Sequence, residues 1–199
     1  MRNNTVPVKN VARLVEAGEA LLRRPPGMPG MGLVEGETGY GKTTAMVWYA
    51  NKCNAVVVRA RATWTPAAML GAILKELGRE PRGSCSQMMD EIVEALALAA
   101  RPLFIDEADY IVDSKRMTES ARDLHDVAVI PVVLIGMGGI DVRLSHRKQL
   151  TGRVMQHVHF KPCDLEDARK LADSLCDVRV RDDLLERVHA RAGGAADLV

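Results

Sequence analysis

One short segment carries three glycines, a lysine and threonines at the spacing that a phosphate-binding loop requires. It reads Gly36-Glu37-Thr38-Gly39-Tyr40-Gly41-Lys42-Thr43-Thr44, and all but its last residue form the pattern G-x-x-x-x-G-K-T. Glycines let the backbone turn its N–H groups inward around a phosphate, where a side chain would collide. We therefore predict that this segment binds a nucleotide, with Lys42 at the β- and γ-phosphates and the Thr43 hydroxyl on Mg²⁺.

A pair of adjacent carboxylates, Asp106 and Glu107, closes an apolar run at 102–105. Asp106 is suited to orient Mg²⁺ through the water shell of the ion. Glu107 is suited to act as a general base that polarises a water molecule for attack on the γ-phosphate. An acidic loop after a strand is the alternative, but the complete phosphate loop upstream favours the catalytic interpretation.

Alternating strands and helices would position both features. An apolar run at 31–34 leads into the loop, and a helix at 44–52 would point the positive end of its dipole at the phosphates. Further strands are predicted at 55–59, 102–105, 131–136 and 158–160, and helices at 11–24, 66–77, 86–100, 118–127, 165–176 and 182–192, with caps at Asn10, Thr65 and Asp164. This alternation predicts an α/β fold with a parallel sheet and helices on both faces.

Composition narrows the class of protein. A chain of 199 residues with 47% apolar residues fits one α/β domain, with room for a small helical appendage. The net charge of +1 means that nucleic-acid binding would need a local basic patch. Because no apolar run approaches the length of a membrane span and the first residues do not open a signal peptide, we expect a cytoplasmic protein without a membrane partner.

The cysteines and histidines give weaker signals. Cys53, Cys85, Cys163 and Cys176 form no C-x-x-C pair and are typical of reduced, packed thiols. His157 and His159 are two residues apart on an expected strand and would therefore share one face. A metal site there needs further ligands that the sequence does not reveal, so Mg²⁺ is the only metal that we predict.

The nucleotide is predicted to be ATP. The guanine-binding pattern N-K-x-D has only a near miss at 51–54, directly after the phosphate-loop helix and far from its usual late position. Kinases of small metabolites usually lack a D-E pair at the end of a strand. The pair indicates an ATPase of the class with an extra strand between the strands that carry the two motifs, and 131–136 would be that strand.

The sequence resembles the AAA+ ATPases that regulate transposition, namely the phage Mu B protein and its TnsC, TniB and IstB relatives. The resemblance spans roughly residues 28–165 and is carried by the phosphate loop, Leu103 to Asp109, Leu124-His125-Asp126, 132–139 and 150–154. Many families share the first two motifs, and the later series D-E-A-D, L-H-D and I-G-M-G-G narrows the choice.

The resemblance implies a P-loop AAA+ fold: a five-stranded parallel sheet flanked by helices, with a small C-terminal helical lid. The implied divisions are an N-terminal helical segment at 1–27, a nucleotide-binding core at 28–162 and the lid at 163–199, which we expect to continue beyond the given sequence. The implied function is ATP-dependent, non-specific binding of duplex DNA and its delivery to a transposase, with hydrolysis releasing the DNA. A homo-oligomer, either a ring or a helical filament, in a bacterial host cell is implied, and a phage origin stays open.

Several basic residues acquire roles through this resemblance. An arginine before the last strand completes the ATP site of the neighbouring subunit in such proteins, and Arg153 is the first candidate, with Arg147 second. A solvated basic loop is the alternative for both. Two loops would line the DNA channel of an oligomer and contact phosphates without reading sequence, and they carry Arg59, Arg61, Lys115 and Arg116.

Two positions depart from the resembled pattern. The position after the inserted strand usually holds a polar residue, whereas here Gly136 and Met137 cannot contact the γ-phosphate by a polar side chain. The usual lid arginine would fall in Gly194-Ala195-Ala196-Asp197, which contains none. Both departures predict slow hydrolysis that DNA or a partner stimulates. They also keep open one alternative, a nucleotide-gated signalling or scaffold module without DNA binding. A second alternative, a helicase-loader-like ATPase, stays open because it would share the same core.

Overall fold

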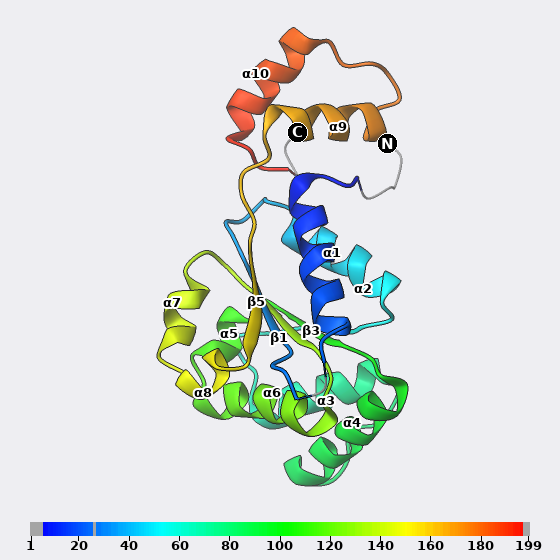
Figure 1. Cartoon of the computed structure of the whole chain (residues 1–199), viewed down its shortest axis with the longest axis vertical. Coiled ribbons are helices and arrows are strands. Elements are labelled where there is room, and N and C mark those ends of the chain that lie inside the picture. The colour runs from blue at the N-terminus through cyan, green and yellow to red at the C-terminus, as the bar shows by residue number, and fades with distance from the viewer. Residues whose placement is uncertain (1–5, 26, 197–199) are drawn as a thin grey trace.

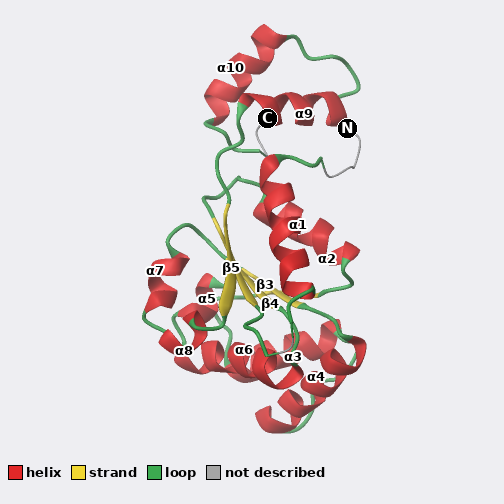
Figure 2. Ribbon diagram, in the orientation of Figure 1, coloured by secondary structure: helices red, strands yellow, loops and turns green. Residues whose placement is uncertain are grey.

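Five parallel strands form one sheet at the centre of the chain (Figures 1 and 2). The computed structural model describes residues 6–25 and 27–196. The strands are β1 (Met31–Glu35), β2 (Val56–Arg59), β3 (Leu103–Asp106), β4 (Val132–Ile135) and β5 (Val154–His159), and their order is β2-β3-β4-β1-β5. The predicted five-stranded parallel sheet is thus confirmed, although β5 begins four residues before the predicted 158.

Strand β4 lies between the strands that carry the two predicted motifs. Its Leu134 is in register with Leu33 of β1 on one side and with Ile105 of β3 on the other. All residues of these three strands are buried, which accounts for their continuous apolar runs. The prediction of 131–136 as an inserted strand is therefore confirmed.

Helices connect the strands and cover both faces of the sheet (Figure 2). They are α1 (Lys9–Leu22), α2 (Lys42–Lys52), α3 (Pro66–Glu76), α4 (Cys85–Ala99), α5 (Asp109–Val112), α6 (Lys115–Ala128), α7 (Ile140–Ser145), α8 (Lys148–Thr151), α9 (Leu165–Leu175) and α10 (Asp182–Ala192). Thr65 caps α3 by accepting the Ala68 N–H, and Asp164 caps α9 by accepting the Asp167 N–H, as predicted. No membrane-spanning helix is present among the described residues, since none is both long and apolar enough.

Two apolar cores fill the space between the sheet and its helices, one on each face. Successive residues of β1 point to opposite faces, so Leu33 packs in the core under α3, α4 and α6, while Val34 packs in the core under α1 and α2. In the second core, Tyr49 of α2 stacks on Phe104 of β3 with ring centroids 6.1 Å apart. Trp64, which is partly buried, packs against the first core.

The last two helices form a pair set apart from the sheet (Figure 1). They have a small apolar cluster of their own, in which Cys163 and Ala168 meet Leu185. Helix α10 ends at Gly193 in the left-handed conformation, as its Gly-Gly sequence predicts. All four cysteines are free thiols: Cys163 is buried, Cys53 and Cys176 are half-buried, and Cys85 is exposed and therefore not packed as predicted.

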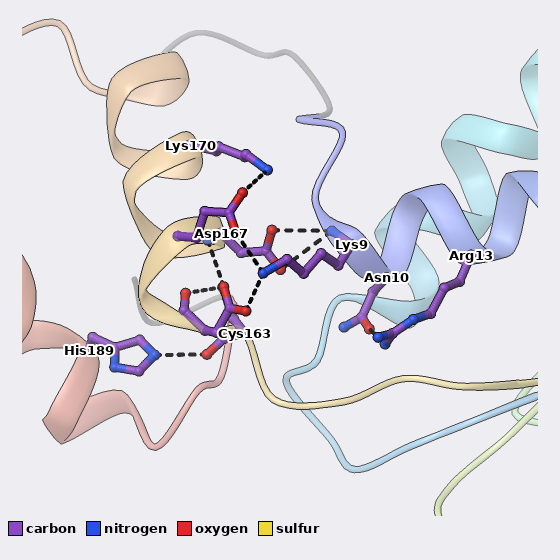
Figure 3. Close-up of polar contacts among 9 residues, drawn as sticks. Lys9, Asn10, Arg13, Cys163, Asp167, Lys170 and His189 are labelled. Carbon is purple, nitrogen blue, oxygen red and sulfur yellow. Dashed lines mark hydrogen bonds and ion pairs between the residues drawn. The ribbon is translucent and has the colours of Figure 1, made fainter.

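Polar contacts attach the start of α1 to the start of α9 (Figure 3). The Lys9 ammonium forms ion pairs with Asp164 and Glu166, and the Lys9 backbone N–H donates to Asp167 Oδ1 at 3.2 Å. The prediction that Asn10 caps this helix is wrong, because Val8 occupies the cap position and Asn10 lies inside the helix. Its buried amide bonds to both backbone groups of Lys161, so tertiary contacts account for this polar residue.

Candidate active site

The predicted phosphate loop connects β1 to α2 and requires its glycines. Gly36 has φ of +155°, and a Cβ there would lie 2.7 Å from the carbonyl oxygen of Phe160. Gly41 has φ of +80° and is the residue before the first turn of α2. Both positions disfavour any side chain, so the loop keeps a cradle lined by backbone and open to the start of the helix.

Lys42 and Thr43 lie in the first turn of α2 and face the loop and β3. The Lys42 ammonium donates to the carbonyl oxygens of Gly36, at 2.6 Å, and Glu37, at 2.8 Å. Burial lowers the Lys42 pKa, and the negative charges of Glu107 and Asp106 oppose that shift. The Thr43 hydroxyl donates to Asp106 Oδ2 at 3.1 Å. A hydroxyl and a buried carboxylate in contact are the oxygen donors that suit Mg²⁺, so these residues fit the predicted ion.

A pocket of about 270 Å³ opens at the carboxyl ends of the strands. It brings together predicted residues from four separate segments, and its lining consists of Thr38, Gly39, Gly41, Lys42, Thr43, Thr44, Arg59, Asp106, Glu107, Gly136 and Met137. Tyr40 of the predicted segment instead packs against the apolar core under α1 and α2. The phosphate loop and the carboxylate pair thus share one cavity.

Glu107 is held in an unusual backbone conformation and by an ion pair. Its φ of +53° is left-handed, which is costly for a residue with a side chain. Arg59 Nη2 lies 2.8 Å from Glu107 Oε1, and Arg59 Nε lies 3.8 Å from Asp106 Oδ2. The hydrogen bond to Glu107, followed by the charge of Asp106, raises the pKa of Arg59.

Arg59 lies beside the carboxylate pair. Strand register places it next to Asp106, at the mouth of the nucleotide pocket. Its guanidinium contacts the two carboxylates while its side chain stays 64% exposed, and its DNA contact stays a prediction. Arg61, two residues on, is exposed.

Asp109 is a site residue that the sequence did not reveal as one. It lies in α5, accepts the Met137 N–H at 2.8 Å through Oδ2, and pairs with Arg143 of α7 through Oδ1. These contacts fix the segment after β4, which contains Gly136 and Met137, the two candidates for the expected polar position. The sequence shows an acidic residue three positions after Asp106, but it does not show that Asp109 contacts Met137 and Arg143, because these partners are distant in sequence.

Arg153 lies at the amino-terminal ends of the strands, whereas the phosphate loop lies at their carboxyl ends. It precedes the first residue of β5, whereas the loop follows the last residue of the parallel neighbour β1. Its guanidinium makes two contacts with the Asp126 carboxylate, at 3.0 and 3.1 Å. Arg153 therefore does not reach the pocket of its own chain, and its role toward a neighbouring subunit stays a prediction.

A second hollow of about 420 Å³, here called the basic groove, lies between α6 and the α7–α8 segment. Its lining comprises Lys115, Thr118, Glu119, Arg122, His146, Arg147, Lys148, Gln149 and Leu150. Lys115 and Arg116 belong to the first turn of α6, not to a loop as predicted, because Ser114 caps the helix before them. The fold thus brings Lys115 next to Arg147, the second arginine-finger candidate.

The segment after α10 contacts the phosphate loop. The Ala196 N–H donates to the carbonyl oxygen of Gly39 at 2.8 Å, and the Cys163 N–H donates to that of Gly194, also at 2.8 Å. This segment is where the usual lid arginine was expected. Gly194, Ala195 and Ala196 have no charged side chain that could contact a phosphate. Asp197, the last residue of that prediction, lies outside the described residues.

Comparison with known proteins identifies both a family and a fold. The sequence profile of the family described as "AAA domain" matches residues 27–144. Among solved structures, the ORC2 protein of Aeropyrum pernix in its ADPNP–ADP complexes superimposes with a TM-score of 0.73 at 17% identity, covering 100% of this chain and 62% of that one. The A. pernix ORC1 protein in complex with DNA gives 0.65 at 19% identity, covering 99% and 58%.

A third structure, Cdc6p of Pyrobaculum aerophilum, has a TM-score of 0.64 at 19% identity and covers 94% of this chain and 56% of that one. This chain thus spans about three fifths of the length of these structures. At such low identity, the likeness establishes the fold alone. A search of curated proteins found no match.

Proposed function

Since this chain belongs to the AAA domain family, we propose that it is an ATPase that binds ATP with Mg²⁺ at the carboxyl ends of β1, β3 and β4. The contact between Thr43 and Asp106, at 3.1 Å, carries this proposal. It pairs the hydroxyl of the phosphate loop with the carboxylate of the second motif, across a pocket that also contains Lys42 and Glu107.

Each residue of the pocket has a distinct proposed task. Lys42 exchanges its two carbonyl contacts for the β- and γ-phosphates and offsets their charge. Thr43 and Asp106 hold Mg²⁺, which neutralises phosphate charge when it is bound. Glu107 accepts a proton from the water molecule that attacks the γ-phosphorus as the bond to the β-phosphate breaks.

We further propose that the ATP-bound protein binds duplex DNA without sequence preference and presents it to a transposase. The sequence resemblance to transposition regulators supports this role. The basic groove supports it as well, because it supplies a local positive surface on a chain whose net charge is only +1. Arg61, Lys115 and Arg116 are the proposed phosphate contacts, and Arg59 would join them only after leaving Glu107.

A second candidate is an initiator-like role in which the protein loads a replicative helicase. A shared nucleotide-binding fold supports it, and one of the solved structures with that fold, the A. pernix ORC1 protein, is in complex with DNA. Affinity purification from the native host distinguishes the two roles, because a transposase is expected to copurify in the first and a helicase in the second.

The size of the protein particle with duplex DNA tests the proposed function directly. Light scattering with ATP and then with ADP is expected to give large DNA-bound assemblies only with ATP. ATP binding that is indifferent to DNA, with a monomer in both states, would instead support a nucleotide-gated signalling or scaffold module.

A further inference from the structure

Glu35 is a buried carboxylate that the proposed ATPase mechanism does not use. It is the last residue of β1, and its side chain is only 6% exposed. Its Oε1 lies 2.8 Å from His157 Nε2 and 3.3 Å from His159 Nδ1, and its Oε2 accepts the Gly139 N–H at 3.1 Å. Two imidazoles therefore converge on one buried oxygen.

The register of the sheet explains this convergence. Glu35 of β1 pairs with His159 of β5, and Leu33 pairs with His157. Residues two apart on a strand point to the same face, so both histidines lie on the side of Glu35. Because β5 is an edge strand, their outer parts remain in contact with solvent, at 43% and 57% exposure.

A second carboxylate reaches the same place from another element. Asp141, in the first turn of α7, offers an oxygen that lies within 4.8 Å of the ligand atoms of Glu35 and His157, and these two also lie within 4.8 Å of each other. The cluster thus combines nitrogen and oxygen donors from β1, β5 and α7. Of the two histidines found in the sequence, His157 thus acquires two carboxylate partners, whereas His159 joins the cluster only through its contact with Glu35.

We propose that Glu35, Asp141 and His157 form a binding site for a divalent transition metal of the zinc class, with His159 as a hydrogen-bond partner of Glu35 and water as the fourth ligand. Imidazole with carboxylate suits Zn²⁺, whereas Mg²⁺ and Ca²⁺ prefer oxygen donors alone. Bonds of about 2.0–2.2 Å in a tetrahedral site would hold ligand atoms about 3.3–3.6 Å apart. Glu35 and His157, whose ligand atoms are now 2.8 Å apart, would therefore have to separate by about 0.5–0.8 Å.

The site is distinct from the proposed Mg²⁺ site but adjoins the phosphate loop. Glu35 directly precedes Gly36, and Gly139 ends the segment that contributes Met137 to the nucleotide pocket. A metal there would cross-link β1, β5 and α7 immediately behind the phosphate loop. The inference does not depend on ATP hydrolysis, because it concerns different ligands and can be measured without nucleotide.

Competition between the full chain and a chromophoric chelator for Zn²⁺ tests the site. The titration is made without nucleotide and with excess Mg²⁺, so that oxygen-only sites are occupied. A Cys85→Ser background removes the exposed thiol. One equivalent of Zn²⁺ is expected to bind, and His157→Ala should weaken binding on the order of tenfold or more. His146→Ala removes an exposed histidine outside the cluster and should leave the affinity unchanged.

Two results would overturn the proposal: no Zn²⁺ binding by the parent protein, or equal binding by the parent, His157→Ala and His159→Ala. Both histidines are exposed, so their replacement spares the core, and circular dichroism checks the fold. The Co²⁺-loaded parent gives an independent readout. Strong visible absorption is expected for a tetrahedral ion with three protein ligands and one water, and the weak absorption of a six-coordinate ion would contradict the site.

Discussion

Arg59 Nη2 lies 2.8 Å from Glu107 Oε1, so the cation that ends β2 holds the carboxylate proposed as the general base. The same register that pairs Arg59 with Asp106 places it there. In this arrangement Glu107 is committed to a cation instead of a water molecule. We therefore expect ATP hydrolysis to be restrained until Arg59 is drawn away, for which DNA phosphates are a suitable competitor.

Replacing Arg59 by Ala should therefore raise ATP hydrolysis in the absence of DNA. Exposed ion pairs contribute up to about 1 kcal/mol, which corresponds to a rate increase of up to about fivefold. Phosphate release at saturating ATP is the measurement. Arg61→Ala is the matched control and should leave the DNA-free rate as it is. A lower rate for Arg59→Ala would mean that the guanidinium assists the reaction instead of restraining it.

Replacing Glu107 by Gln should keep ATP binding and remove hydrolysis, because only the group that accepts the proton is changed. A loss of about 10²- to 10⁴-fold is expected for a general base. The variant should also remain on DNA with ATP. Lys42→Ala should differ by losing ATP affinity itself, as measured with a fluorescent nucleotide. Parental turnover by Glu107→Gln would remove this residue from the proposed role.

Replacing Lys115 and Arg116 together by Ala should weaken binding to all duplex sequences equally. The slope of log affinity against log salt should flatten by about 0.9 for each lost phosphate contact. Anisotropy titrations at several salt concentrations give this slope. A double variant of Lys75 and Arg82 removes the same charge from exposed positions outside the basic groove and should keep the slope. Equal slopes for both double variants would exclude α6 from the interface.

Protein stability should fall as the pH drops below about 6.5, in part because of His125. This buried imidazole accepts the Gly30 N–H at Nε2, and its Nδ1 lies 2.7 Å from the Ile130 carbonyl oxygen, so the neutral form is favoured. Burial lowers the His125 pKa below its usual value. The unfolded chain then binds more protons than the folded one, and acid favours unfolding.

Urea denaturation at pH 7.5 and pH 5.5 measures this effect of His125. His125→Gln should reduce the difference in unfolding free energy between the two pH values. His146→Gln, at an exposed position, should preserve the difference. An unchanged difference in the His125 variant would assign the acid sensitivity to other groups.

The four thiols should react with an alkylating reagent in an order set by exposure. Cys85 is exposed and should be modified first. Burial, followed by the charges of Asp167 and Asp164, raises the pKa of Cys163 to about 11, so little thiolate is present at neutral pH. Mass spectrometry of timed digests follows each site. Early modification of Cys163 would show that the α9–α10 pair opens readily.

Local sequence patterns predicted the phosphate loop, the carboxylate pair and the inserted strand, because glycine spacing and apolar runs are properties of neighbouring residues. The same logic failed for α5, α7 and α8, which have four to six residues and are too short to show a helical period. Strand β5 extends to Val154 because backbone pairing with β1 continues through residues that are only partly buried.

Site contacts between residues that are distant in sequence could not be predicted from local patterns. The ion pairs of Arg59 with Asp106 and Glu107 were not predicted, because strand register sets them. Asn10 resembled a cap because its amide suits that position, whereas its partner, Lys161, is remote in sequence. Glu35 gave no signal at all as the partner of His157 and His159, since a glutamate before a glycine-rich loop is uninformative without the neighbouring strand.

Helix α1 is attached at both ends, to α9 through Lys9 and to the segment before β4 through Arg24, and it therefore links these two parts of the molecule. Its first turn is fastened beside the segment that touches the phosphate loop, and beyond its last turn Arg24 donates to the Val129 carbonyl oxygen at 2.8 Å. Arg24 there shares a hollow with Asp126 and Arg153. If the α9–α10 pair tilts on nucleotide exchange, we expect α1 to move with it. That movement would then shift Arg153, at the amino-terminal ends of the strands, where it would meet the next subunit.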